Sequence, residues 1–426
     1  MRRNPSPPST PDNNMLMLLL YTVGIFFYRC GIAIASLFNL KARKWQKGRK
    51  HIFELLEQNF DGTEHPIWVH CASLGEYEQG KPLIEKIKKE RPDTKVLLTF
   101  FSPSGFEACQ KDSLPDYIFY LPFDFRHNAK RFIRTVKPQM AIFVKYEFWF
   151  NYIYELNKQQ IPFYYISAIF RPNQYFFRKT GRWFCRQLQK ASYFFVQNEE
   201  SQQLLKNVGI TQVEICGDTR FDRVAAVARQ TEPVEAVMQF QQQSKLIVAG
   251  STWPPDEKLL AEVMPHLPDY RIIVAPHEIK RSDDAVKTFA AFKTCRLTSA
   301  SAEELAMSRV LIVDTIGLLK KIYRYGTFAY VGGAFKTGLH NILEAAVYGI
   351  PVFFGPHYQH FNEAVLLTKC QGAFPVTTAD QMRDKIVFFT QHPEEYQRTC
   401  HICQDYIQSN LGSCDRIFNI IQKHIV

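Results

Sequence analysis

The chain has 426 residues, which is too long for one typical domain and suits two domains with an appendage. Its formal net charge of +11 favours an anionic partner, namely a nucleic acid, a membrane surface or a phosphorylated substrate, and does not choose among them. The ten cysteines form no paired framework, which argues against a disulfide-stabilised secreted domain. Cys400 and Cys403 form a lone CxxC motif, and we interpret them as structural because no second pair completes a zinc site.

The N-terminal segment predicts a membrane anchor. Residues 1–14 carry four prolines among polar residues and predict a disordered tail. Residues 15–40 are apolar apart from Arg29 and a few small polar residues, and they are long enough to span a bilayer or to lie in its interface. Six positive charges follow within residues 41–50, and such flanks stay cytoplasmic. We therefore expect an anchor over 15–50 and a body on the cytoplasmic face of the inner membrane. A cleaved signal peptide is the alternative, but the basic cluster lies on the wrong side of the apolar run for export.

Short apolar strands alternate with amphipathic helices over residues 51–230. This alternation predicts a parallel sheet covered by helices on both faces, in an N-terminal Rossmann-like domain. The expected strands are Ile67–His70, Lys95–Thr99, Tyr117–Leu121, Ala141–Val144, Phe163–Ser167, Tyr193–Val196 and Val213–Cys216. The polar, Gln-rich residues 231–244 predict a linker.

A second alternating series over residues 245–405 predicts a second doubly wound domain, and a C-terminal helix over 406–426 can pack back on the first. The expected strands are Leu246–Ala249, Arg271–Ala275, Val310–Val313, Phe328–Val331 and Val352–Phe354. The expected helices include Ile316–Tyr325 and Asn341–Tyr348. Ligands of such sheets bind at the carboxyl ends of the strands, so we expect an α/β fold whose two domains face a cleft.

The stretch Tyr330–Phe361 predicts a nucleotide-phosphate site. Its first strand ends at Gly332-Gly333, where backbone can approach a ligand closely because no Cβ intervenes. A helix beginning near Asn341 would direct unpaired N–H groups and a positive dipole end at the preceding loop. An ordinary βαβ crossover with glycines for tight packing is the competing interpretation.

Several strand-end motifs, in their order and spacing, resemble a known family. They are IWVHCASLGEYEQGKPLIE at 67–85, TFFSPSG at 99–105, YEFWFN at 146–151, ISAIFR at 166–171, GDTRFD at 217–222, GSTW at 250–253, VDTIG at 313–317 and GLHNILE at 338–344. The family comprises the membrane-associated Kdo transferases, GT-B glycosyltransferases that move 3-deoxy-D-manno-octulosonic acid (Kdo) from CMP-Kdo onto the lipid A precursor. The resemblance covers nearly the whole chain. It implies an enzyme of lipopolysaccharide biosynthesis that inverts the sugar centre in a single displacement.

The strongest catalytic candidate is Glu76, which directly follows a strand at a helix start. Transfer to a sugar hydroxyl needs a base within hydrogen-bond reach of the proton, and the resemblance implies that Glu76 is this base. A helix N-terminal glutamate favoured by the dipole is the structural alternative. Further acceptor-binding candidates at the strand ends of this domain are Ser73, Glu147, Asn151, Ser167 and Arg171.

In the second domain the resemblance implies that Gly338, His340, Asn341 and Glu344 bind the CMP part of the donor. Asn341 would cap the helix and Glu344 would accept from ribose hydroxyls. Further donor-binding candidates are Ser251, Thr252, Pro276, His277, Arg281 and Gly317.

The chain departs from the family pattern at three positions. His277 stands where the family has an arginine, which puts the positive donor contact in doubt and leaves Lys280 or Arg281 as substitutes. Leu318 replaces a usual acidic residue, and Ala334 stands where serine is common. We interpret these departures as lineage variation.

Both expected substrates are anionic, which gives part of the positive charge a role. We predict no cofactor and no metal site, because the histidines are dispersed. Nucleic-acid binding ranks lowest, because the basic residues cluster beside the anchor. The other hypotheses are another GT-B transferase with a lipid-linked acceptor, a nucleotide-sugar epimerase, and a non-catalytic membrane-tethered nucleotide-binding protein. The anchor argues against the epimerase, and the third option requires that Glu76 be incidental.

Overall fold

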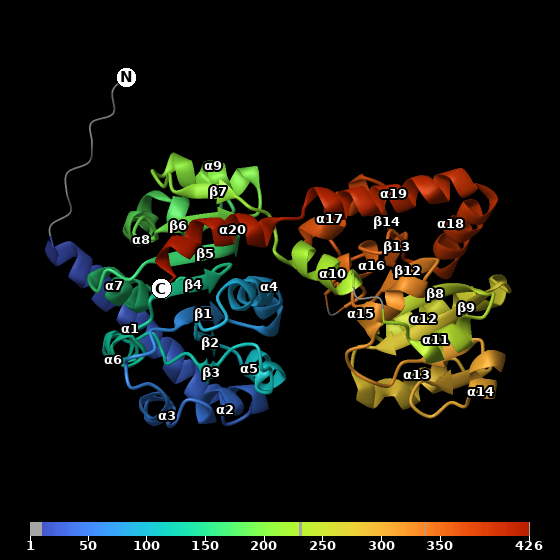
Figure 1. The fold of residues 1–426 in the computed structure, drawn as a ribbon, viewed down its shortest axis with the longest axis horizontal. Helices are drawn as coiled ribbons and strands as arrows, with labels where there is room; N and C mark the ends of the chain where they lie inside the picture. Colours follow the sequence, from blue (N-terminus) through green and yellow to red (C-terminus); the bar gives the residue numbers. More distant parts are fainter. Residues whose placement is uncertain (1–10, 230–231, 337, 426) are drawn as a thin grey trace, which may run out of the picture. The chain divides into compact units, whose positions relative to one another are not determined.

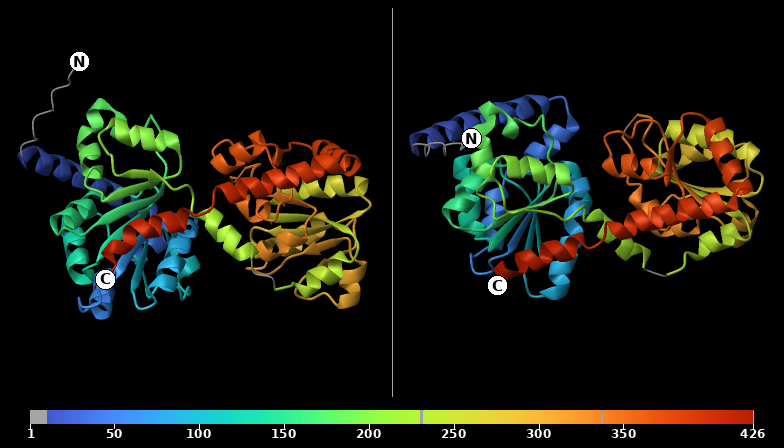
Figure 2. Two further views of the ribbon diagram at one scale, coloured as in Figure 1. Left: turned by 45° about the horizontal axis from the view of Figure 1, so that its top comes forward. Right: turned by 90° about the horizontal axis from the view of Figure 1, so that it is seen from above.

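The computed structural model describes residues 11–229, 232–336 and 338–425, and the chain divides into two compact units (Figure 1). Unit 1 runs to Arg220 and resumes at Gly412, and unit 2 spans Phe221–Leu411. Each unit contains a seven-stranded parallel sheet with helices on both faces (Figures 1 and 2). The predicted α/β class with two doubly wound domains is confirmed.

The sheet of unit 1 has the strand order β3-β2-β1-β4-β5-β6-β7. Its strands are β1 Ile67–Cys71, β2 Val96–Phe100, β3 Tyr117–Tyr120, β4 Met140–Val144, β5 Phe163–Ala168, β6 Tyr193–Val196 and β7 Val213–Ile215. In the register, Ile67 pairs with Val96 on one side and with Met140 on the other. Strands β1, β2 and β4 are buried along their whole length, as expected of apolar runs covered on both faces.

Ten α-helices of the described residues belong to unit 1, and the last of them, α20, comes from the segment after Gly412. They are α1 Pro11–Ala35, α2 Leu40–Lys47, α3 Ile52–Asn59, α4 Leu74–Glu90, α5 Pro103–Cys109, α6 Arg126–Val136, α7 Phe150–Lys158, α8 Arg182–Leu188, α9 Glu199–Asn207 and α20 Ser413–Ile421, with short 3₁₀ turns η1 Tyr175–Phe177, η2 Lys179–Gly181 and η6 Gln422–His424. Helix α20 packs against α4 and buries Ile417 and Ile421 in the core of unit 1. The end of the chain therefore completes the first sheet's helical cover.

Helix α1 begins within the predicted tail, of which residues 1–10 lie outside the described residues. From Met15 to Ala35 it is long and apolar enough to cross a membrane. One face is nevertheless docked on unit 1, because Leu18 is buried in the core and the Tyr21 hydroxyl donates to Asp124 at 2.7 Å. The remaining surface exposes large apolar side chains, among them Leu19, Leu20, Phe26, Phe27 and Ile34.

The sheet of unit 2 has the order β10-β11-β9-β8-β12-β13-β14. Its strands are β8 Lys245–Thr252, β9 Tyr270–Pro276, β10 Thr294–Arg296, β11 Val310–Ile312, β12 Phe328–Val331, β13 Val352–Phe354 and β14 Ala373–Pro375. The edge strands β10 and β14 are absent from the predicted set, since each has three residues and no apolar run. The predicted linker carries α11 Glu235–Gln241, which buries Val237 and Phe240 against the sheet.

The helices of unit 2 surround this sheet. They are α10 Arg220–Ala228, α11, α12 Pro254–Val263, α13 Ser282–Thr288, α14 Ala302–Met307, α15 Leu319–Ile322, α16 Leu343–Ala346, α17 Asn362–Lys369, α18 Ala379–Gln391 and α19 Pro393–Ser409, with 3₁₀ turns η3 Met264–His266, η4 Ile279–Arg281 and η5 Tyr323–Tyr325. The predicted helices over 316–325 and 341–348 are wrong in extent. Gly317 lies two residues before α15, and Gly349 lies three residues after α16. Both have a positive φ, which a right-handed helix does not contain. Cys400 and Cys403 of α19 are buried, which suits structural residues.

Candidate active site

Each sheet has one point at which the strand order reverses, and there two neighbouring strands direct their following loops apart. In unit 1 this point lies between β1 and β4, and in unit 2 it lies between β8 and β12. Ligands of doubly wound sheets bind outside the carboxyl ends of the strands at such points. The candidate residues therefore form two groups, one in each unit, and each group is called a half-site below.

Glu76 is the third residue of α4 and follows β1 by five positions. Its Oε2 accepts hydrogen bonds from the backbone N–H groups of Ala72 at 2.5 Å and Ser73 at 3.1 Å. Burial raises the pKa of the Glu76 carboxyl to about 7, and the negative charge of Glu147 adds to the rise, while Lys145 and the two N–H groups oppose it. Such a carboxyl exchanges protons near neutral pH, as a general base should.

Glu147 follows β4 and belongs to a polar network on the other side of the reversal point. Its Oε2 lies 3.1 Å from His70 Nε2 and accepts from Trp149 Nε1 at 2.8 Å. His70 is fully buried in β1, and its Nδ1 lies 2.9 Å from the Thr99 hydroxyl. The network fixes the Glu147 side chain, which is 11% exposed, in the same half-site as Glu76.

The sequence prediction missed His70, Lys145 and Tyr146 as site residues. The charges of Arg171 and Glu76 both act on the Tyr146 hydroxyl, whose pKa is raised chiefly by burial. Lys145 has a left-handed backbone at φ 63°, which turns the chain directly after β4. A polar residue inside an apolar strand is the signal that identifies His70, since a buried imidazole needs hydrogen-bond partners.

The remaining acceptor candidates fall into two groups. Ser73 precedes α4, and Arg171 is exposed after β5, so both stay near the strand ends. Asn151 is fully buried, and its amide donates to the Asp124 carbonyl at 2.6 Å and to Thr22 of α1 at 3.3 Å. The buried Ser167 hydroxyl lies 3.1 Å from that of Thr219. Asn151 and Ser167 thus face the interior of unit 1.

In unit 2 the glycines after β12 serve close packing of the chain on itself. A Cβ at Gly332 would lie 2.4 Å from the Ser251 carbonyl oxygen, and one at Gly333 would lie 2.3 Å from that of Gly338. Asp256 of α12 accepts from the Gly333 N–H at 3.0 Å and the Tyr330 hydroxyl at 2.8 Å. The sequence suggested that Gly332 and Gly333 let a ligand approach the backbone. In the structure these two glycines are required by close packing against the protein's own backbone instead.

Three aromatic rings stack above these strand ends. The His277 ring stands 5.0 Å from Trp253 and 4.3 Å from His340, measured between centroids. Trp253 Nε1 donates to His340 Nε2 at 3.3 Å. Burial, with the neighbouring His277, lowers the pKa of His340 to about 4. The His340 imidazole is therefore neutral at pH 7, and its Nδ1 carries the remaining proton as a donor.

Asn341 and Glu344 lie together in the short turn that contains α16. The Asn341 amide donates to Glu344 at 3.4 Å, and Lys320 forms an ion pair with Glu344 at 3.3 Å. Asn341 Oδ1 accepts from the N–H of Leu343, the first residue of α16. The N-cap position of α16 is Ile342, so Asn341 lies one residue before the position from which a side chain ordinarily caps a helix. Because α16 has four residues, its dipole offers less than the predicted longer helix.

The other donor candidates differ in exposure. Ser251 and Gly338 have positive φ and are partly accessible, and Gly317 lies exposed after β11. Pro276 ends β9 and is buried. The buried Thr252 hydroxyl donates to Glu257, and Arg281 donates to the same carboxylate at 2.9 and 3.3 Å. Arg281 thus neutralises the charge of a fully buried glutamate, to which Thr252 donates a further hydrogen bond.

The missed residues of this half-site are Trp253, Asp256 and Lys336. With Gly333 and Phe335 they line a cavity of about 220 Å³ beside the ring stack. The exposed Lys336 supplies a cation there. Its signal in the sequence is its place in the glycine-rich loop after β12.

Comparison with known proteins agrees with this architecture. Over 84% of the chain and the full length of the other protein, the fold is similar to that of UDP-GlcNAc 2-epimerase from Neisseria meningitidis, with a TM-score of 0.60 and 15% identity. It is also similar to MurG of Acinetobacter baumannii, with a TM-score of 0.53 and 11% identity over 84% of this chain and all of that one. The chain is an α/β protein of the GT-B class.

Proteins of similar sequence include Kdo transferases. Residues 43–223 match the family model described as 3-deoxy-D-manno-octulosonic-acid transferase (kdotransferase). The 3-deoxy-D-manno-octulosonic acid transferase of Chlamydophila psittaci is 25% identical over 420 residues, which cover 94% of this chain and 96% of that protein. The chain is similar to Kdo transferases over nearly its whole length and is a glycosyltransferase, in agreement with the resemblance of its motifs.

Proposed function

We propose that this protein transfers Kdo from CMP-Kdo to a hydroxyl of a lipid A precursor, with Glu76 as the general base. The observation that carries the proposal is a carboxyl group at the carboxyl end of β1, beside the reversal point of the unit 1 sheet, whose pKa is about 7. The family supports the identity of the donor and the place of the reaction in lipopolysaccharide biosynthesis.

In the proposed reaction Glu76 takes the proton of the acceptor hydroxyl while that oxygen forms a bond to the anomeric carbon of Kdo. The bond between this carbon and the phosphate oxygen of CMP breaks in the same step, so the configuration inverts. Glu147 keeps the carboxyl of Glu76 basic enough for this role, because its negative charge disfavours a second carboxylate nearby. His70 and Trp149 act as positioning residues for Glu147.

Unit 2 would bind the nucleotide part of the donor. The neutral His340, donating through Nδ1, and the cation of Lys336 are suited to the phosphate oxygens. Asn341 and Glu344, held by Lys320, are suited to ribose hydroxyls. Lys336 can also replace the positive donor contact that His277 leaves open, since it supplies a cation near the ring stack, where this chain lacks the arginine of the family pattern. Thr252 and Arg281 would act indirectly, by keeping β8 and the turn η4 in place.

The test is a transfer assay with CMP-Kdo and a lipid A precursor, comparing wild type with Glu76→Gln. The variant keeps the size of the side chain and removes the base, so we expect kcat to fall by roughly 100-fold to 10,000-fold. Glu85→Gln is the matched control, because Glu85 is an exposed glutamate of the same helix. Full activity in Glu76→Gln would remove the assigned base, and an inactive wild type would refute the proposed reaction.

A further inference from the structure

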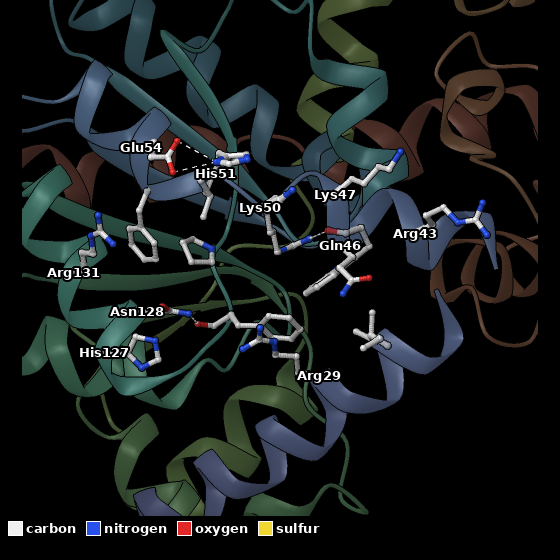
Figure 3. Close-up of a pocket in the computed structure, with 18 residues that line it drawn as sticks. Arg29, Arg43, Gln46, Lys47, Lys50, His51, Glu54, His127, Asn128 and Arg131 are labelled. Atoms are coloured by element: carbon white, nitrogen blue, oxygen red, sulfur yellow. Dashed lines mark hydrogen bonds and ion pairs between the residues drawn. The ribbon is translucent and has the colours of Figure 1, made fainter. Parts of the chain in front are cut away.

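A large cavity lies on unit 1 among α1, α2, α3 and α6 (Figure 3). Its volume is about 690 Å³. Figure 3 shows Arg29 of α1 on one side and Lys50, His51 and Glu54 on the other, with His127, Asn128 and Arg131 of α6 between them. None of these residues belongs to the half-sites described above.

The lining of this cavity is cationic. It contains Arg29, Arg43, Lys47, Arg49, Lys50 and Arg131, against one carboxylate, Glu54. Glu54 is engaged by His51 at 3.1 Å, and Arg131 pairs with Glu57 outside the lining. Arg49 is held by the protein itself, because its guanidinium lies 3.6 Å from the Trp45 ring centroid and donates to the Phe101 carbonyl at 2.7 Å.

Four of these cations have no acidic partner in the described part of the chain: Arg29, Arg43, Lys47 and Lys50. Arg43 donates to the backbone carbonyls of Ser36 and Leu37. Arg29 lies about 6 Å above the rings of Phe123 and Phe125, at 5.9 and 5.8 Å from their centroids, and is otherwise exposed. Like charges around one cavity repel each other, and an anion bound in the cavity would relieve this repulsion.

Apolar side chains of α1 border the cavity. Arg29, Ile32 and Ala33 bring the last turns of α1 to its rim, and the neighbouring α1 surface exposes Phe26 and Phe27. Directly after α1, Leu37 is 66% exposed and Phe38 is 88% exposed. An apolar helix surface with cations beside it is the composition of a segment that lies in a membrane interface.

We propose that this cavity binds a lipid-borne phosphate group, while α1 lies flat in the bilayer interface with its docked face kept on unit 1. Arg29, Lys47 and Lys50 contact the phosphate. The exposed apolar side chains of α1 and of the residues directly after it insert between the headgroups and the acyl chains of the bilayer. Two sources carry this chemistry, namely an anionic phospholipid of the bilayer and a phosphorylated lipid acceptor. Binding to a phospholipid is independent of the proposed transfer reaction, whereas binding to the acceptor rests on it.

The first arm of the test measures binding of the full chain to phosphatidylcholine vesicles with and without roughly one third phosphatidylglycerol, by flotation, with no acceptor present. The variant is Arg29→Gln/Lys47→Gln/Lys50→Gln. Each cation near an anionic surface contributes roughly fivefold, so we expect roughly 100-fold weaker binding to the anionic vesicles. The control is Lys89→Gln/Arg91→Gln/Lys206→Gln, which removes the same charge from exposed positions outside the cavity and should change binding far less.

The second arm measures transfer in neutral detergent micelles that contain no phospholipid, with the phosphorylated acceptor and its dephosphorylated form. A higher KM of the cavity variant for the phosphorylated acceptor alone identifies the acceptor as the source. Weaker vesicle binding with an unchanged KM identifies the phospholipid. Equal losses in the cavity variant and its control, or no loss in either arm, would overturn the proposal. A wild type that binds anionic vesicles but transfers nothing would refute the proposed function while leaving this site intact.

Discussion

The pH dependence of transfer offers a direct test of whether Glu76, the proposed base, is tuned by the charges around it. Burial and the charge of Glu147 raise the pKa of Glu76 to about 7, from an ordinary value of 4.5. The difference corresponds to roughly 3 kcal/mol of preference for the protonated carboxyl. Because the base must be ionised, kcat/KM should fall on the acid side with a midpoint near pH 7, and only about one tenth of the activity should remain at pH 6.

Two neighbouring charges should move this midpoint in opposite directions. Glu147→Gln removes a negative charge that raises the pKa of Glu76, so the acid limb should move to lower pH. Lys145→Gln removes a positive charge that lowers the same pKa, so the limb should move to higher pH. Each displacement should be on the order of 0.5 to 1 pH unit, because a partly solvated charge interaction amounts to roughly 1 kcal/mol.

The assay is kcat/KM for CMP-Kdo and acceptor between about pH 5 and pH 9 in wild type and both variants, with Glu85→Gln as the control for a charge change on α4. The position of the limb is the readout rather than its height, since Glu147→Gln also removes a partner of His70. Displacement of both limbs in one direction, or an unmoved midpoint, would refute the electrostatic reasoning. A limb that persists in the residual activity of Glu76→Gln would show that another group is titrating.

Four further substitutions test the fold around the two half-sites. Tyr21→Phe removes the hydrogen bond from α1 to a buried carboxylate, and we expect about 1 to 3 kcal/mol less stability and faster hydrogen exchange in α1. Gly333→Ala meets a carbonyl oxygen at 2.3 Å and a φ of +97°, so it should cost more than roughly 2 kcal/mol in urea unfolding, whereas Gly317→Ala, at +94° with nothing nearby, should cost about 1 kcal/mol. Arg281→Ala should lower stability by roughly 3 to 5 kcal/mol by leaving Glu257 unpaired, while the folded fraction keeps its donor affinity in calorimetry; a lost affinity at unchanged stability would instead make Arg281 a direct donor ligand.

The central strands could be predicted from sequence almost residue by residue, because apolar runs such as Met140–Val144 are buried on both faces and stand out from polar helices. The edge strands Thr294–Arg296 and Ala373–Pro375 could not, since half-exposed strands of three residues carry no hydrophobic pattern. Helix α16 shows the converse error. Its apolar spacing continues past Ala346, but Gly349 turns the chain after a single helical turn.

Local motifs predicted the position of the proposed base Glu76, whereas its electrostatic environment depends on packing between distant segments. Glu76 could be placed because a strand, a Ser-x-Gly-Glu turn and a helix start are contiguous. The contact of His70 with Glu147 joins residues 77 positions apart, and it exists only because β1 pairs with β4 in the observed register. Nothing in either motif alone indicates that the two side chains meet.

The apolar segment at the N-terminus shows most clearly what length and hydropathy leave open. By composition it can either span a bilayer or lie along one, with Arg29 as a cost in the first case. The structure gives that side chain a place against Phe123 and Phe125 at the rim of the cationic cavity. A spanning α1 would have to withdraw Leu18 from the core and Tyr21 from Asp124, a buried acid whose pKa burial raises to about 7. The docked contacts therefore favour a helix that stays on unit 1, so that in the proposed interfacial binding only its outer face would contact lipid.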